Sequence, residues 1–231
     1  MQPYTFQVFG IEHIISIIAI IFVFVAFLKF NKDLGIKDDS RSFLIVLAFF
    51  MISLDLSEDL VRVFTGFYSF RKDLPLQLCS IGVYLAAHTL LSRKQVFFDL
   101  IFYWGFVGAS NAILTPDGDL FELKIFFFYS QAYHAALIFA VLWLMIKYDM
   151  RMRYNSILKV VISTNVIVGL LSILNYIIDS NYMFLRQIPN SVSPFLMGEW
   201  PIYIIMVQVI SIILVVLFIT IQNIFMRPIK L

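Results

Sequence analysis

Cys79 is the only cysteine among the 231 residues, and it lies near the start of an apolar segment. A thiol becomes a nucleophile when a neighbouring imidazole or a helix N-terminus favours the thiolate. His134 and His13 could each supply such an imidazole. Cysteine is also a common core residue, and a buried histidine often only joins two helices through a hydrogen bond. The residues alone therefore leave both a cysteine–histidine nucleophile and two structural side chains open.

These side chains lie within a chain of membrane-protein composition. Hydrophobic residues make up 61% of the sequence and charged residues 14%, whereas about a quarter of a soluble domain is charged. Backbone groups in lipid must be satisfied within the segment itself, so apolar runs of membrane-spanning length form helices. We predict an all-α integral membrane protein of one domain, residues 1–231, with seven transmembrane helices near residues 9–30, 43–64, 74–91, 96–114, 123–147, 157–178 and 201–225.

Composition also excludes several kinds of site. A single cysteine excludes an internal disulfide and a thiolate metal cluster. The basic residues are confined to short loops rather than gathered on one face, so we expect no nucleic-acid partner. The first apolar run lacks the basic flank and cleavage site of a signal peptide, and we expect it to remain as a membrane helix. We expect no metal and no cofactor, and the sequence leaves the question of a homo-oligomer open.

The placement of lysine and arginine predicts the orientation. If the N-terminus is outside, 12 of the 17 basic residues fall on the inner side. Cytoplasmic loops are enriched in lysine and arginine, so we predict an N-out, C-in, multi-pass protein of the cell membrane. The inner set is Lys29, Lys32, Lys37, Arg41, Arg93, Lys94, Lys147, Arg151, Arg153, Lys159, Arg227 and Lys230.

The predicted orientation brings Cys79 and His134 to similar depths. Asp73 is a plausible N-cap, and Pro75 suits the first turn of a helix that runs inward. Cys79 follows Asp73 by six residues and His134 follows Lys124 by ten. The difference of about four residues is ~6 Å along a helix, which tilt can absorb. With Cys79 past the first turn, an imidazole rather than the helix dipole would have to activate it.

The second run carries a charged stripe. Asp55, Glu58, Asp59 and Arg62 are spaced i, i+3, i+4 and i+7, which places them on one face of a helix. Charges at membrane depth are costly unless they face a bundle interior or water. We expect the stripe to face inward in the outer half of the bundle. The alternative is a solvated helix end that protrudes above the bilayer.

Most other embedded polar residues fall in the outer half as well. We therefore predict a polar cavity open to the outer side, with residues 179–200 folded back over it. A transporter or receptor could bind a small polar or cationic ligand in such a cavity, and the weak evidence for internal repeats argues against alternating access. Besides the stripe and Cys79, the residues expected there are Glu12, His13, Gln77, Asn111, His134, Asn175, Tyr176 and Arg186.

Several short motifs occur in an order and spacing that match a known family across nearly the whole chain. They are Phe9-Gly10 with His13, residues 74–79, residues 114–117, His134, residues 175–186 and residues 200–203. Together they resemble the YwaF family of bacterial integral membrane proteins. Animal relatives of that family are described as acyltransferases that place polyunsaturated chains on ether phospholipids. The chain departs from many members at Gln77, where they have histidine, and Gln77 cannot act as a base.

The resemblance implies roles for individual residues. The nucleophile falls on Cys79 and its histidine partner on His134. We therefore expect a membrane lipid acyltransferase or transacylase that forms an acyl-thioester on Cys79 in the outer half of the bilayer. Gln77, Asn111 or free backbone N–H groups would stabilise the oxyanion. The expected substrates are a phospholipid and a lyso-lipid, held by the residues His13, Glu58, Asp59, Arg62, Asn175, Tyr176 and Arg186.

Overall fold

The computed structural model describes residues 4–30 and 41–225, and the regular structure within these ranges is helical. Short 3-10 turns occupy Gly118–Leu120, Tyr154–Ser156 and Tyr182–Phe184. The longer helices are α1 (Ile11–Phe30), α2 (Arg41–Thr65), α3 (Leu78–Ser92), α4 (Gln95–Ile101), α5 (Ala109–Leu114), α6 (Lys124–Tyr148), α7 (Ile157–Ile177) and α8 (Ile202–Phe225).

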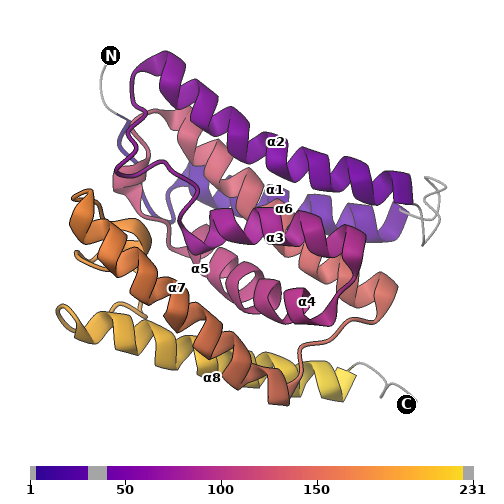
Figure 1. Ribbon diagram of the computed structural model, residues 1–231. Coiled ribbons are helices and arrows are strands. Elements are labelled where there is room, and N and C mark those ends of the chain that lie inside the picture. The colour runs from indigo at the N-terminus through magenta and orange to yellow at the C-terminus, as the bar shows by residue number, and fades with distance from the viewer. Residues whose placement is uncertain (1–3, 31–40, 226–231) are drawn as a thin grey trace.

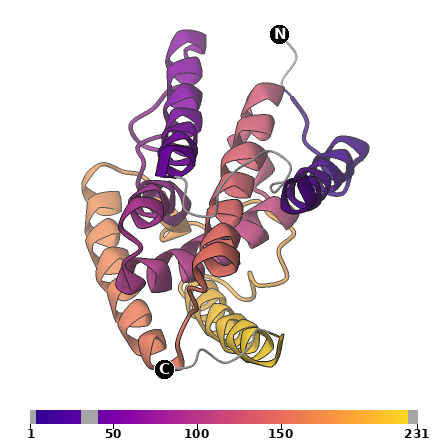
Figure 2. The same ribbon diagram turned by 90° about the vertical axis from the view of Figure 1, so that its right-hand side faces the viewer.

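Helices α4 and α5 are two parts of one continuous rod. The π-helical segment η1 (Phe102–Gly108) joins them without a break in helical backbone angles. With this rod the described chain contains seven long helical units, as the apolar runs predict. Successive units alternate in direction, so α1, α3, α6 and α8 run one way and the others run back (Figure 1). Viewed along the bundle, α1 and α8 lie on its periphery (Figure 2).

Four units are long and apolar enough to cross a membrane: Gln95–Leu114, Lys124–Tyr148, Tyr154–Ile177 and Ile202–Ile224. Their outward side chains are apolar, since large aliphatic residues of α7 and α8 are exposed along the whole helix. A polar solvent would not favour such surfaces, whereas lipid does. The chain is therefore a membrane protein. Of the basic residues used to predict orientation, Lys32, Lys37, Arg227 and Lys230 lie outside the described ranges.

Helix α3 begins four residues later than the sequence predicts, and this changes the position of Cys79. Gln77, in an extended conformation, is the N-cap, and residues 74–77 are not helical. The prediction of Asp73 as N-cap was wrong, because tertiary contacts hold this segment: Leu74 N–H donates to the Tyr182 hydroxyl (3.0 Å). Cys79 is therefore the second residue of the helix, within reach of its dipole.

Helices α3 and α6 and the segment η1 approach closely at one point of the core. A Cβ at Gly82 would lie 3.3 Å from Leu137 Cδ2, and a Cβ at Gly105 would lie 3.0 Å from Leu137 Cγ. Leu137 is fully buried, and Trp104 Cβ lies 4.0 Å from the same Cβ position at Gly82. Glycine on two helices thus lets both backbones approach one leucine of a third.

The segment between α7 and α8 folds back over one end of the bundle, as predicted. Asn175 of α7 is fully buried, and its side chain accepts from Tyr182 N–H (2.8 Å) and donates to Tyr182 O (2.9 Å). Ser193 Oγ donates to Asn111 Oδ1 (3.1 Å). Trp200 Nε1 donates to Leu185 O (2.8 Å). This segment and the loops around residues 66–77 and 115–123 lie at the same end of the bundle (Figure 1).

The packing predicts that Gly105→Val destabilises the protein while Gly169→Val does not. A side chain at Gly105 collides with Leu137, whereas nothing lies within 4 Å of a Cβ at Gly169. Overpacking of this kind costs about 1–3 kcal/mol. Both variants add the same β-branched residue to a helix, so thermal unfolding of the purified protein in detergent isolates the packing effect. Equal melting temperatures for the two variants would contradict this account of the core.

Candidate functional site

The thiol of Cys79 lies between α3 and the end of η1. A Cβ at Gly108 would lie 3.9 Å from Cys79 Sγ, so glycine at this position leaves space beside the sulfur. The cysteine is half-buried rather than enclosed. π-Helical segments such as η1 are frequent at functional sites. Cys79 therefore lies on the inner side of α3, beside an irregular part of the neighbouring helix.

His134 on α6 is held in one tautomer. Its Nδ1 lies 2.7 Å from the carbonyl oxygen of Ser130, which can only accept a hydrogen bond. Nδ1 therefore carries the ring proton, and Nε2 presents a lone pair. No donor to Nε2 occurs among residues 4–30 and 41–225. The ring is buried and lies against that of Tyr133, with centroids 4.1 Å apart. This is the state in which a histidine acts as a base.

The helix register places Cys79 and His134 at the same level. Helices α3 and α6 run in the same direction (Figure 1), and Gly82 of one contacts Leu137 of the other. Cys79 precedes Gly82 by three residues and His134 precedes Leu137 by three. Each is thus about one turn from the same contact. In the part of the chain that is described, no hydrogen bond joins the two side chains directly.

The start of α3 also offers backbone donors. The first N–H groups of a helix have no intrahelical partner. In α3 the first intrahelical hydrogen bond is donated by Ile81 N–H to Gln77 O (3.0 Å). The N–H groups of Cys79 and Ser80, which precede Ile81, therefore have no intrahelical acceptor. Donors at this position could bind a negatively charged oxygen beside the thiol.

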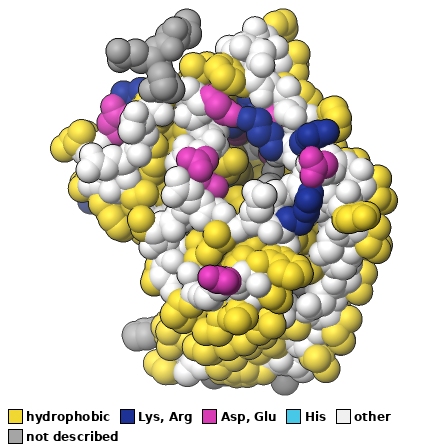
Figure 3. All heavy atoms as spheres, turned by 90° about the vertical axis from the view of Figure 1, so that its left-hand side faces the viewer, with side chains coloured by type: hydrophobic (Ala, Val, Ile, Leu, Met, Phe, Trp, Pro, Cys, Tyr) yellow, Lys and Arg dark blue, Asp and Glu magenta, His cyan; other side chains and the backbone are white. Residues whose placement is uncertain are grey.

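A cavity of about 90 Å³ lies on the other side of α3, between α2 and α6. Its walls include Ser80, the neighbour of Cys79, together with Ser130 and Tyr133 next to His134. Basic and acidic side chains surround a hollow at this end of the molecule (Figure 3). The charged lining residues are Asp55, Glu58, Asp59, Arg62, Lys72 and Asp73. The stripe of α2 therefore faces inward, and Asp55 is buried against Tyr84, whose hydroxyl donates to it (2.8 Å).

Arg62 is the centre of the ion pairs at this end. It donates to Glu58 (3.0 Å), to Glu122 (2.9 Å) and to the backbone oxygen of Leu120 (2.9 Å). Its guanidinium also lies 4.0 Å above the Phe126 ring. These contacts join α2 to the loop before α6. Because its donors are largely engaged, Arg62 acts as a structural link within the charged cluster.

Two loop carboxylates near Arg62 have shifted pKa values. Burial raises the pKa of Asp73, although Ser69 N–H and Arg62 act in the opposite direction. Burial alone would also raise the pKa of Glu122, but its hydrogen bond with Lys72 and the charge of Arg62 lower it below the ordinary value. Glu122 is therefore ionised at neutral pH and holds both cations.

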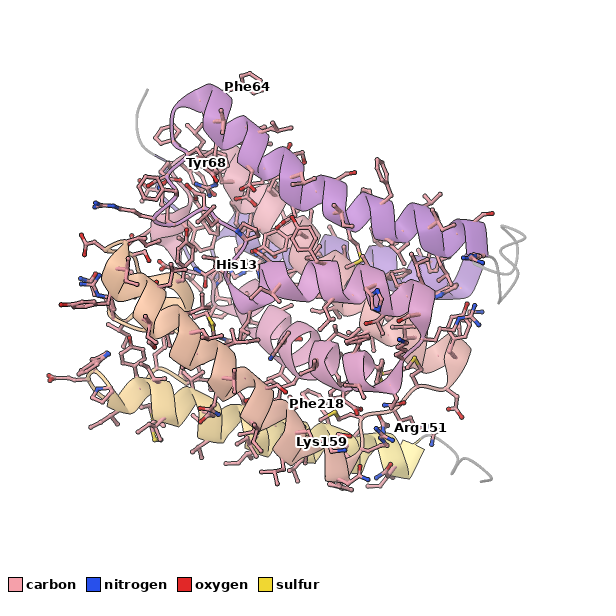
Figure 4. The ribbon with its side chains drawn as sticks, in the orientation of Figure 1. His13, Phe64, Tyr68, Arg151, Lys159 and Phe218 are labelled. Atoms are coloured by element: carbon pink, nitrogen blue, oxygen red, sulfur yellow. The ribbon has the colours of Figure 1, made fainter. Side chains whose placement is uncertain are left out.

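His13 and Gln77 are occupied by structural hydrogen bonds. His13 is fully buried inside the bundle (Figure 4), where its Nδ1 accepts from Phe9 N–H (3.0 Å) and its Nε2 donates to Ile113 O (2.7 Å). With both nitrogens engaged, His13 fits a structural role. Gln77 lines the cavity, and its Oε1 accepts from Met183 N–H (2.8 Å).

Asn111, predicted as an oxyanion or orienting group, and the remaining residues predicted for substrate binding do not line the cavity. Asn111 Oδ1 accepts from Thr115 and Ser193, and Asn175 holds the overlying segment. Tyr176 is 83% exposed on the outer side of α7, away from the cavity. Arg186 donates to Asp179 (2.8 Å) at the surface.

A model of the TMEM164 family matches residues 8–219. This range contains every residue of the site and all the long helices, apart from the last turns of α8. The chain belongs to the TMEM164 family. This is a family of multi-pass membrane proteins, in agreement with the helical bundle. No curated protein and no solved structure matches the chain.

In this TMEM164-family chain the site includes groups that the sequence interpretation did not select. Ser130 and Tyr133 line the cavity next to His134, and Glu122 and Asp73 complete the pairs around Arg62. Ser130 is spaced i−4 from His134, and that spacing was a usable signal. Glu122 and Asp73 lie in loops, so no helical pattern could relate them to α2. No group of three metal-ligating side chains occurs in the described ranges.

We predict that Glu122→Gln destabilises the protein at neutral pH but not in acid. A depressed folded-state pKa contributes stability that is present above the unfolded value and is lost as the pH falls through the folded value. Losing a charge-assisted pair costs about 1–3 kcal/mol. Melting temperatures in detergent should therefore differ between wild type and Glu122→Gln at pH 7. The difference should shrink as the pH falls below the ordinary glutamate value of 4.5. A difference that is constant from pH 7 to pH 3 would contradict it.

Proposed function

We propose that the protein transfers acyl chains between membrane lipids through a thioester on Cys79, with His134 as the base. The observation that carries this proposal is the arrangement of the pair. The thiol, beside Gly108 of η1, and an imidazole with an unpaired Nε2 each lie about one turn from the same contact between α3 and α6. The resemblance to the YwaF family, whose animal relatives are acyltransferases, supports the same pair of residues.

The chemistry follows from the atoms available. His134 Nε2 accepts the thiol proton, and the thiolate attacks the ester carbonyl of a phospholipid. The S–C bond forms, the ester C–O bond breaks, and the leaving lyso-lipid oxygen takes the proton back from His134. Transfer to a second lyso-lipid reverses these steps. The N–H groups of Cys79 and Ser80 would stabilise the oxyanion, with Gln77 and Asn111 as further amide donors.

The lipid headgroup would lie at the end of the bundle covered by residues 179–200. Arg186 is the better candidate for the phosphate, because its side chain is 42% exposed while that of Arg62 is almost fully buried among carboxylates. We further propose that all seven helical units span the bilayer with the N-terminus outside, in the cell membrane. The placement of lysine and arginine supports this orientation.

Labelling with an alkyne-tagged phospholipid tests the proposed function. Membranes containing wild type should carry a protein adduct that hydroxylamine releases, and Cys79→Ala should carry none, because Cys79 is the only thiol. His134→Gln should form the adduct about 10²–10⁴-fold more slowly, the usual effect of losing a general base. Tyr176→Phe is a matched control, since Tyr176 faces away from the site. Equal labelling of wild type and Cys79→Ala would rule out the thioester.

A second candidate function has a specific observation of its own, the acidic cavity. Four carboxylates line it against two cations, Arg62 and Lys72. Asp59 forms no ion pair or hydrogen bond within the described ranges. A receptor or transporter could therefore hold a small cationic ligand there, with Asp59 as its counter-charge.

Binding of small amines such as ethanolamine and choline to the purified protein separates this candidate from the acyltransferase. Asp59→Asn should weaken binding about tenfold or more, since a charge-assisted contact is worth about 1.5–3 kcal/mol. Cys79→Ser should bind as wild type does. Binding that is lost in Cys79→Ser, or unaffected in Asp59→Asn, would exclude the cavity as the ligand site.

A further inference from the structure

Gln131 on α6 is a buried amide without a partner. Its side chain is 3% exposed, and neither Oε1 nor Nε2 has a hydrogen-bond partner in the described part of the chain. A buried amide that makes no hydrogen bond is strongly unfavourable, so native proteins rarely retain one without a reason. A side chain with both a donor and an acceptor unpaired points to a ligand that supplies both.

The helix register places Gln131 one turn beyond the Cys79–His134 level. The η1–α5 rod runs opposite to α6 (Figure 1), with Gly105 against Leu137 and Gly108 against Cys79. Gln131 precedes His134 by three residues on α6, a helix that α5 also contacts. Gln131 is therefore a neighbour of the imidazole on the side from which residues 179–200 cover the bundle.

The next turn of α6 restricts what can reach this amide. Phe127 is fully buried and packs against Phe6 and Phe121, with ring centroids 5.0 and 5.6 Å apart. The amide thus lies between an aromatic layer and the thiol–imidazole level. Such surroundings suit a ligand that is mainly apolar and carries one polar group at this depth.

The pairing requirements of the amide select the polar group. An ester carbonyl or a phosphate can only accept, and an ammonium can only donate, so each would leave one atom of Gln131 unpaired. A hydroxyl both donates and accepts, and one hydroxyl can close a ring with the C=O and N–H of a primary amide. We propose that Gln131 binds the free hydroxyl of the lyso-lipid that accepts the acyl chain.

This inference rests on the proposed function and gives Gln131 one task in it. In the second step the hydroxyl proton passes to His134, the hydroxyl oxygen bonds to the thioester carbon, and the C–S bond breaks. His134 then returns the proton to Cys79. Gln131 Nε2–H keeps its hydrogen bond to the hydroxyl oxygen and holds it towards the thioester.

Binding measured without the reaction tests the role of Gln131. In a Cys79→Ala background we compare a lysophospholipid with its deoxy analogue, in which hydrogen replaces the free hydroxyl. The protein should prefer the hydroxyl lipid about tenfold or more. Gln131→Leu should remove the preference, leave the affinity for the deoxy lipid unchanged, and melt at or above the temperature of its parent, because it buries no unpaired amide. Gln131→Met, also unbranched at Cβ, provides the same test if the leucine variant folds poorly.

The outcomes distinguish the role of Gln131 from the proposed acyltransferase function. Equal affinity for the two lipids with Gln131 present would overturn the inference, and the amide would then bind only water. If the lipids are distinguished but wild type forms no Cys79 adduct, the acyltransferase fails and the hydroxyl site stands. If the adduct forms in wild type and in Gln131→Leu alike, but only wild type passes it to a lyso-lipid at full rate, both hold. Equal transfer rates in the two proteins would exclude the role of Gln131.

Discussion

The contact of Gly82 and Gly105 with Leu137 determines the geometry of the candidate site. Three helices meet at one buried leucine, and two of them can do so only because they lack a side chain there. Close-packed interiors transmit small changes in volume, so this contact sets the register of α3 against α6. Cys79 and His134 lie one turn along from it. Because this register already places both residues at the same position along the bundle, neither side chain needs a strained conformation to approach the other.

The second constraint is the cost of charge in an apolar environment. The carboxylates of α2 lie at one end of the bundle, and Arg62 and Lys72 neutralise part of their charge there. The loops that contribute Asp73 and Glu122 are thereby tied to α2. Residues 74–77 are bound in turn by Tyr182 and Met183 of the overlying segment. The start of α3, and with it the position of the thiol, therefore depends on loops far away in the sequence.

The apolar runs were sufficient to predict the helices, because lipid-exposed and core residues are both hydrophobic and only charged or turn residues end a run. The run predicted at 43–64 is α2, Arg41–Thr65, and that at 123–147 is α6, Lys124–Tyr148. The start of α3 was missed because tertiary hydrogen bonds override the local signals of Asp73 and Pro75. The spacing of the α2 stripe was enough to predict its inward face, whereas the position of Cys79 counted from Asp73 was wrong and the outward direction of Tyr176 was missed.

The direction in which a side chain points depends on its angular position around the helix, which the residue types do not reveal. Asn175 and Tyr176 are neighbours in the sequence, yet about 100° of helix rotation separates them, and one is fully buried while the other faces outward. The same difference applies to the two candidate histidines. Both are buried, but His13 has a partner on each nitrogen, whereas His134 has one only on Nδ1. Each contacts one backbone carbonyl, and the backbone N–H of Phe9, which donates to His13 Nδ1, is what distinguishes them.

Ser130 connects the two polar regions of the molecule. Its carbonyl oxygen holds His134 Nδ1, and its side chain lines the acidic cavity. A thiolate on Cys79 would lie between α3 and η1, and a charge without a paired cation is disfavoured in such a low-dielectric interior. A free thiolate is therefore disfavoured, and in the proposed reaction attack on an ester would be easiest if the proton left for His134 as the S–C bond formed. In the proposed reaction the fixed tautomer of His134 would allow that simultaneous transfer, because the proton on Nδ1 leaves the Nε2 lone pair to accept the thiol proton.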